Sequence, residues 1–198
     1  MDQLASPFGI GRDPEAFEVF YRAHVEAVQR FVARRVGDPE VAADLTADVF
    51  VALIEAADGY RPELGSPVAW LYGIAHRVVS GHRRRRLREL ELVRRVSGRR
   101  LLDADGLERV QERLDAQRAA RRLQPALDRL PAGERATFEL VALDGLSLTD
   151  AAAALGVKPV TARVRLHRAR RALGAAANSS ARDRPRPGEP TPIPEVLS

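Results

Sequence analysis

The segment that decides the fold is Leu146-Ser147-Leu148-Thr149-Asp150-Ala151-Ala152-Ala153-Ala154-Leu155-Gly156-Val157. Ser147 can cap the amino end of a short helix, with Asp150 three residues later in the manner of a capping box. Gly156 supplies the left-handed residue that commonly ends a helix. A second helix follows after only two residues, so the segment predicts a helix-turn-helix.

The second helix has one apolar face and one cationic face. At about 100° per residue, four apolar side chains fall on one stripe that we expect to be buried: Ala162, Leu166, Ala169 and Leu173. The opposite arc holds Val160, Arg163, Val164, His167, Arg168 and Arg171. Residues 158–171 include six bases and no acid. Such a helix fits the major groove of DNA, where arginine binds guanine and valine meets a thymine methyl. The alternative is an arginine-rich surface helix without a ligand.

The composition of the whole chain limits the possible functions. Its 198 residues suffice for one domain or two small ones. The absence of cysteine excludes a disulfide framework, a zinc–thiolate site and a cysteine nucleophile. The apolar stretches are far shorter than the roughly 20 residues that a membrane span needs. Because residues 1–10 show no basic start followed by an apolar run, we expect no secretory signal and a cytoplasmic protein without membrane insertion.

Charge alternates in blocks along the chain. The net charge is +5, and Lys158 is the only lysine. Residues 13–58 have a net charge of −6 and residues 77–100 a net charge of +8. Residues 103–150 have −3, and residues 158–171 have +6. The alternation indicates separate partner surfaces and the basic blocks indicate a polyanion, although solvated helix faces would give the same pattern.

Nearly every periodic segment is helical, and the alternating patterns of strands are missing, so we expect an all-α fold. The expected helices of the first half cover residues 14–36, 39–57 and 67–86, with a loop at 58–66. Three short helices are expected between residues 134 and 173.

These elements predict two small helical domains, at residues 13–86 and 124–173. A flexible, partly helical linker at 87–123 joins them, because this stretch is charged and only weakly amphipathic. Residues 174–198 are expected to be a disordered tail, since they contain many prolines and almost no apolar periodicity.

The helix expected at 39–57 has a narrow acidic stripe beside a core-facing stripe. Its acidic side chains lie within about 80° of one another: Glu40, Asp44, Asp48 and Glu55. The apolar side chains Val41, Leu45, Val49 and Ala52 occupy the neighbouring arc. This arrangement suits docking onto a basic helical partner, and a solvated polar face is the alternative.

The helix that begins near Pro67 has a second pattern. Trp70, Leu71, Ile74 and Val78 share one arc and are expected in the core. Tyr72, His76 and Arg83 share another arc, where an aromatic ring, a histidine and an arginine could hold single-stranded bases.

Together, these stretches resemble a group IV (extracytoplasmic-function) bacterial sigma factor of the sigma-70 family. The resemblance rests on residues 43–50 (ADLTADVF), 70–75 (WLYGIA), the arginine cluster, residues 130–135 (LPAGER) and residues 161–173 (TARVRLHRARRAL). Their order and spacing match from about Phe17 to Leu173.

The resemblance implies a region 2-like helical bundle at 13–86 and a region 4-like helix-turn-helix at 124–173. It implies binding of core RNA polymerase, at the beta-prime clamp helices and the beta flap, with Asp44, Leu45, Asp48, Val49 and Phe50 on the clamp side. It implies contacts to the −10 promoter element from Tyr60, Arg61, Tyr72, His76, Arg77, Arg83 and Arg84. It implies contacts to the −35 element from Lys158, Thr161, Arg163, Val164, His167, Arg168 and Arg171. An anti-sigma factor is a further implied partner.

Two rival functions are weighed against this interpretation. A stand-alone helix-turn-helix regulator would bind a duplex operator without polymerase, and it leaves the N-terminal acidic stripe unexplained. An enzyme would need side chains at the spacing of metal ligands, a phosphate-binding loop or a nucleophile. The four histidines have no metal-ligand spacing, and neither a glycine-rich phosphate loop nor a nucleophile elbow is present. We therefore expect no catalytic residue, no metal and no cofactor.

Overall fold

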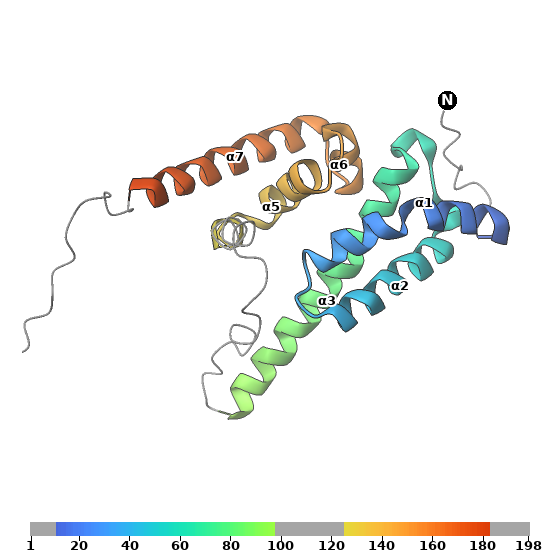
Figure 1. Cartoon of the computed structure of the whole chain (residues 1–198), viewed down its shortest axis with the longest axis horizontal. Helices are drawn as coiled ribbons and strands as arrows, with labels where there is room; N and C mark the ends of the chain where they lie inside the picture. The colour runs from blue at the N-terminus through green and yellow to red at the C-terminus, as the bar shows by residue number, and fades with distance from the viewer. Residues whose placement is uncertain (1–10, 98–124, 183–198) are drawn as a thin grey trace, which may run out of the picture.

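The computed structural model describes residues 11–97 and 125–182, which form helices joined by short turns and no strand (Figure 1). The all-α prediction is confirmed for this part of the chain. The N-terminal unit consists of α1 (Pro14–Ala33), α2 (Pro39–Glu55) and α3 (Pro67–Ser97). The C-terminal unit contains α5 (Ala132–Phe138), a π-helical turn η4 (Glu139–Leu143), α6 (Leu148–Ala154) and α7 (Pro159–Arg182). None of the described helices is long and apolar enough to cross a membrane.

The first two helices begin at aspartates that cap them. The carboxylate of Asp13 accepts a hydrogen bond of 2.9 Å from the backbone N–H of Glu15, and Asp38 does the same for Glu40 at 2.9 Å. A proline follows each aspartate, and its fixed φ suits the first helical position. Both helix starts are where the sequence predicts them.

The core of the N-terminal unit lies among its three helices. Phe31, Leu53, Leu71 and Val49 have essentially no exposed surface. Between α2 and α3, the chain makes two short 3-10 turns, η1 (Ala57–Gly59) and η2 (Pro62–Leu64). These turns occupy the loop that we expect at 58–66.

Two helices are longer than the sequence analysis predicts. The third helix, expected to end at Arg86, continues to Ser97 as α3, so the first part of the expected linker is helical. The last helix continues beyond Leu173 to Arg182, so the expected disordered tail is wrong for residues 174–182. Alanines at 175–177 favour helix, and residues 174–184 contain no proline. The rest of the expected linker and tail lies outside the described residues.

The two units pack against each other in the described structure (Figure 1). Leu140, Leu146, Ala151 and Ala154 of the C-terminal unit belong to the same buried cluster as the core of the N-terminal unit. A second, smaller cluster holds α7 inside its own unit: Leu127, Leu130, Ala169 and Leu173, with Phe138 packed on it. The short helix α6 contacts both α3 and α7, and therefore joins the units.

Replacing Leu53 with alanine should destabilise the chain by about 2–5 kcal/mol, because its side chain is fully buried and a cavity would remain. Val51 on the same helix is 54% exposed, and Val51→Ala should change the free energy of unfolding by less than about 0.5 kcal/mol. Urea denaturation followed by circular dichroism measures both. Equal losses for the two variants would contradict the placement of α2.

Candidate functional site

The acidic stripe of α2 is exposed and its apolar neighbours Leu45 and Val49 are buried, as helical periodicity predicts. Asp44 and Asp48 face solvent. Leu45, Val49 and Phe50 are at most 4% exposed and pack in the core. In this structure these three residues therefore hold α2 in place, and a partner docking on the helix would meet the carboxylates instead.

Sequence reasoning missed an exposed apolar element of the same surface. Val51 is 54% exposed and Ile54 is 39% exposed. Val51 follows Asp44 by seven residues, which is about two helical turns. The helical periodicity that predicts the acidic stripe therefore also places Val51 on it. Next to this surface, Tyr21 of α1 packs edge-on against Phe50, with ring centroids 4.7 Å apart. The α2 surface thus combines carboxylates with apolar side chains, the composition of a protein-docking surface more than of a solvated face.

The loop before α3 is held by aromatic packing. The ring of Tyr60 packs against Trp70, with ring centroids 5.2 Å apart, and its hydroxyl donates a hydrogen bond of 3.0 Å to the carbonyl of Gly65. These residues line a pocket of about 140 Å³ together with Arg61 and with Ala153 of α6. The loop is therefore ordered against α3 and touches the C-terminal unit.

Tyr72 is not the open aromatic face that the sequence predicts. It is 6% exposed and meets Phe31 of α1 edge to face, with ring centroids 5.3 Å apart. Burial raises the pKa of its phenol. Helical periodicity places Tyr72 on a different face of α3 from Trp70. Because α3 is covered on more than one side, this second face is buried as well.

His76 and the arginines of α3 lie at the edge of this covered region. The His76 ring is partly buried, and burial, followed by the charge of Arg35, lowers its pKa, which favours the neutral imidazole. Arg77, Arg83 and Arg84 are exposed.

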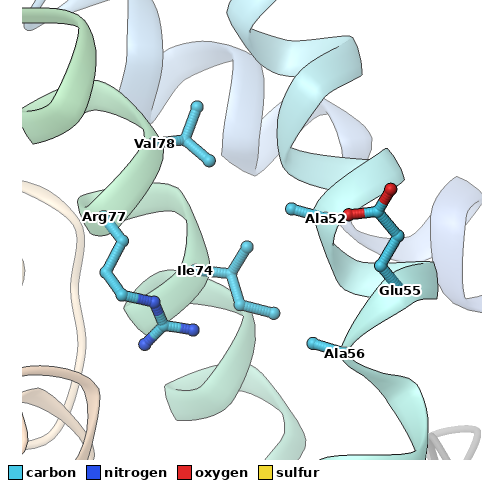
Figure 2. Close-up of a pocket in the computed structure, with 6 residues that line it drawn as sticks. All are labelled: Ala52, Glu55, Ala56, Ile74, Arg77 and Val78. Atoms are coloured by element: carbon cyan, nitrogen blue, oxygen red, sulfur yellow. The ribbon is translucent and has the colours of Figure 1, made fainter.

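A shallow pocket of about 430 Å³ lies between α2 and α3 (Figure 2). Its apolar lining consists of Ile74 and Val78 of α3, Ala52 of α2, and Ala56, which directly follows α2. Arg77 and Glu55 come from opposite helices and give the pocket one cation and one carboxylate.

A larger cleft of about 680 Å³ lies between the units. From α3 it is lined by His76, Arg77, Arg83 and Arg84 among others, and from the C-terminal unit by Arg135 and Arg165. The structure thus brings together four of the residues expected to contact the −10 element. It also places cations of the C-terminal unit opposite them, which the sequence does not reveal.

The helix-turn-helix forms as the sequence predicts. The Ser147 hydroxyl oxygen accepts a hydrogen bond of 3.0 Å from the backbone N–H of Asp150 and donates one of 2.6 Å to its carboxylate. Gly156 has φ +62°, the left-handed conformation that turns the chain from α6 into α7. The turn therefore sets the direction of α7 relative to α6.

The two faces of α7 are also confirmed. Ala162, Leu166, Ala169 and Leu173 are at most 8% exposed. The opposite face is open, with Val160 at 69% and Val164 at 45% exposure. The seven side chains expected at the −35 element are all exposed in the described structure: Lys158, Thr161, Arg163, Val164, His167, Arg168 and Arg171.

Comparison with known proteins assigns these two units. The family description Sigma-70 region 2 matches residues 20–89, and Sigma-70, region 4 matches residues 120–173. The chain is 34% identical over 174 residues to the ECF RNA polymerase sigma factor SigC of Mycobacterium tuberculosis, covering 88% of each chain. The chain belongs to the sigma-70 family. It is a sigma factor, and members of this family bind core RNA polymerase and promoter DNA.

Two further relatives support the assignment of the sigma factor. It is 32% identical over 175 residues to the ECF RNA polymerase sigma factor SigE of Mycolicibacterium smegmatis, covering 87% of this chain and 62% of the relative. The chain thus spans less than two thirds of that protein's length. Among solved structures, it is similar to the sigma factor RpoE of Bartonella quintana in complex with the anti-sigma factor NepR, with 25% identity and a TM-score of 0.61. That match covers 86% of this chain and 99% of the other.

The turn of the sigma factor's helix-turn-helix can be tested with two glycines. A Cβ atom at Gly156 or at Gly81 would meet nothing within 4 Å, so only the backbone differs between them. Gly156→Ala should destabilise the protein by about 1–2 kcal/mol, because alanine at its φ of +62° is strained. Gly81→Ala, in the interior of α3, should stabilise it by about 0.5–1 kcal/mol. Thermal unfolding measures both, and the same sign for the two variants would contradict the turn.

Proposed function

We propose that the chain is a dissociable initiation subunit that binds core RNA polymerase through α2 and directs it to promoters by recognising the −10 and −35 elements. The observation that supports this most is that one chain has two exposed surfaces of opposite chemistry. The acidic and apolar surface of α2 suits a basic protein helix, and the cationic face of α7 suits DNA.

The proposed division of labour follows the domains expected from the sequence. Residues 13–86 bind polymerase and recognise and melt the −10 element, residues 124–173 recognise the −35 element, and residues 87–123 connect them. The helical length of α3 to Ser97 supports a linker that starts later than residue 87.

Docking on polymerase is assigned to Asp44 and Asp48, with Leu45, Val49 and Phe50 as the buried support of α2. Val51 adds apolar contact area on the same stripe. Carboxylates beside apolar side chains would fix the register on a basic partner and speed the encounter, while burial of the apolar side chains supplies affinity.

Recognition of the −10 element is assigned to the loop at Tyr60 and Arg61 and to His76, Arg77, Arg83 and Arg84 of α3. The arginines would hold the strand's phosphates, and Tyr60 would offer its ring to an extruded base. Tyr72 acts differently from our expectation, since in this structure its ring supports α1 instead of facing solvent.

Recognition of the −35 element is assigned to the open face of α7. Arginine reads guanine through its O6 and N7 atoms, and Val164 can meet a thymine methyl. The weak DNA affinities of the two units would combine through effective concentration once polymerase holds both. This role requires no catalysis by the chain and is exercised in the cytoplasm, where polymerase is found. An anti-sigma factor is a further proposed partner, supported by the similarity to RpoE bound to NepR.

The deciding experiment is run-off transcription with purified bacterial core polymerase on a genomic fragment library, with and without the chain. New 5′ ends that share two sequence motifs upstream would support the proposal and supply a promoter. No new initiation, with tight duplex binding in the absence of polymerase, would contradict it in favour of a stand-alone regulator.

Asp48→Arg should abolish binding to core polymerase and leave the fold intact, because the exposed carboxylate is reversed in charge at the centre of the α2 stripe. Glu26→Arg on α1 makes the same charge change at a side chain that is 82% exposed and outside the stripe, and should bind normally. Gel filtration with core polymerase measures binding. Normal binding by Asp48→Arg would remove α2 from the docking surface.

Arg168→Ala should weaken initiation at the mapped promoter by about 1–3 kcal/mol if the guanidinium makes a bidentate base contact, and relax the discrimination against one mutated −35 base pair. Arg170 is exposed at the flank of α7, so Arg170→Ala should lower initiation on all templates alike. Transcription from wild-type and mutated −35 sequences compares the two. Unchanged discrimination by Arg168→Ala would exclude this contact.

A further inference from the structure

The larger cleft, between α3 and the C-terminal unit, gathers positive charge from both of its walls. Its arginines come from α3, from α5 and from α7: Arg77, Arg83, Arg84, Arg135 and Arg165. Among the described residues that line it, the one carboxylate is that of Asp128. The lining is therefore strongly cationic, and the next question is which of these charges are already balanced inside the protein.

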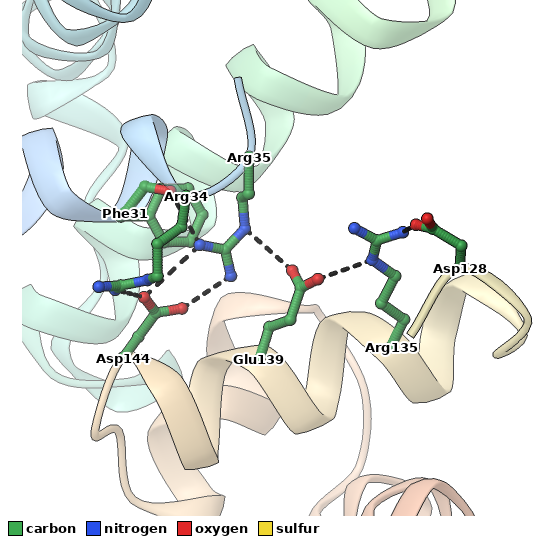
Figure 3. Close-up of polar contacts among 7 residues, drawn as sticks. All are labelled: Phe31, Arg34, Arg35, Asp128, Arg135, Glu139 and Asp144. Atoms are coloured by element: carbon green, nitrogen blue, oxygen red, sulfur yellow. Dashed lines mark hydrogen bonds and ion pairs between the residues drawn. The ribbon is translucent and has the colours of Figure 1, made fainter. Parts of the chain in front are cut away.

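Arg135 is balanced within its own unit. Its guanidinium binds the carboxylate of Asp128 and also that of Glu139, the latter at 2.6 Å (Figure 3). The other four arginines of the cleft form no ion pair with a carboxylate in the described parts of the chain. Because Asp128 is already bound to Arg135, the cleft contains several guanidinium groups whose charge no neighbouring carboxylate neutralises.

Arg165 is the member of this set that DNA recognition does not explain. It lies about 40° from Thr161 around the axis of α7, beside the buried stripe that includes Ala162 and Leu166. Its side chain is half-buried instead of pointing outward with the residues expected at the −35 element. A Cβ atom at Gly133 would lie 2.9 Å from the Cζ atom of Arg165, so the missing side chain leaves room for the guanidinium against α5. The fold thus places this cation in the cleft.

The cleft has the size and the mixed lining of a small-molecule site. Its volume of about 680 Å³ lies within the range of about 300–1,000 Å³ that such sites have. Leu130 and Leu155 of the C-terminal unit and Leu87 of α3 add apolar surface next to the arginines. A ligand with a charged end and a less polar end would therefore meet both kinds of lining.

The charge of the lining selects an anion. Like charges on two facing walls repel each other, and walls of low dielectric focus their field into the cleft. A bound anion removes this repulsion. The planar guanidinium group matches phosphate oxygens in particular, because it can donate two parallel hydrogen bonds to them.

We propose that this cleft binds a small anion that carries two or more phosphate groups, such as a nucleoside polyphosphate. The phosphates contact arginines of both walls, including Arg84 of α3 and Arg165 of α7, and the remainder of the ligand lies against Leu130 and Leu155. The site is independent of the proposed function, because the charge, size and packing of the cleft define it.

Isothermal titration calorimetry of the full chain at about 0.15 M salt tests this site, since exposed charges are largely screened there. The probes are ATP and inorganic pyrophosphate, without Mg²⁺, and we expect one ligand to bind per chain. Arg165→Gln and Arg84→Gln should each weaken binding by at least about tenfold, because each removes charge-assisted hydrogen bonds to phosphate.

The matched control is Arg170→Gln. It removes the same charge from the same helix as Arg165→Gln, but at an exposed position that does not line the cleft. It should leave the affinity for both probes unchanged. Circular dichroism of each variant verifies that the helices are intact.

The two probes share the diphosphate group and distinguish its source. Tighter binding of ATP than of pyrophosphate would support a nucleotide whose nucleoside part lies on the apolar lining. Binding of pyrophosphate at least as tight as that of ATP, with the same dependence on Arg84 and Arg165, would support a free polyphosphate as the ligand.

Three results would overturn the proposal. The first is no binding of either probe at millimolar concentration. The second is an equal loss of affinity in Arg165→Gln and Arg170→Gln, because the anion would then be attracted to the basic chain as a whole. The third is unchanged affinity in either Arg84→Gln or Arg165→Gln, because the anion would then not bridge the two walls of the cleft.

Discussion

The small side chains of α6 are the constraint on which the arrangement of this protein depends. This helix has only seven residues, and Ala151, Ala152 and Ala154 are buried. Because an alanine adds little width, α6 can pack against α7 on one side and α3 on the other. The first contact builds the helix-turn-helix, and the second joins the helix-turn-helix to the N-terminal unit. A leucine at these positions would separate the neighbouring helices, since packed interiors have no room for added volume.

Much of the local structure could be predicted from the sequence because it depends on residues close together in the chain. The caps at Asp13 and Ser147 and the turn at Gly156 each involve only a few neighbouring residues. The buried stripe of α7 follows from helical periodicity, which also gives the exposed acidic stripe of α2. These features needed no knowledge of which helices meet.

The features that sequence reasoning missed depend on contacts between distant segments. Tyr72 points away from Trp70 as the wheel predicts, but Phe31 covers it. In the sequence, Glu139 and Asp144 are part of an acidic block to which no partner can be assigned. The structure places Arg35, more than a hundred residues earlier, beside them, and its guanidinium binds both carboxylates (Figure 3). Helical periodicity correctly placed Leu45 and Val49 in the core, whereas the family resemblance assigned them, with Phe50, to the docking surface. A family pattern does not distinguish a residue that touches the partner from one that positions the helix.

Gly73 shows how stability and restraint compete at a single position. Glycine in a helix interior lowers stability by about 0.5–1 kcal/mol relative to alanine, so Gly73 makes α3 less stable than alanine would. One methyl group would strengthen the helix, but it would press on the backbone of Ala154. Selection for a stable N-terminal unit alone would therefore favour the replacement of this glycine. A glycine that persists at this position would indicate that contact between the units is itself under selection.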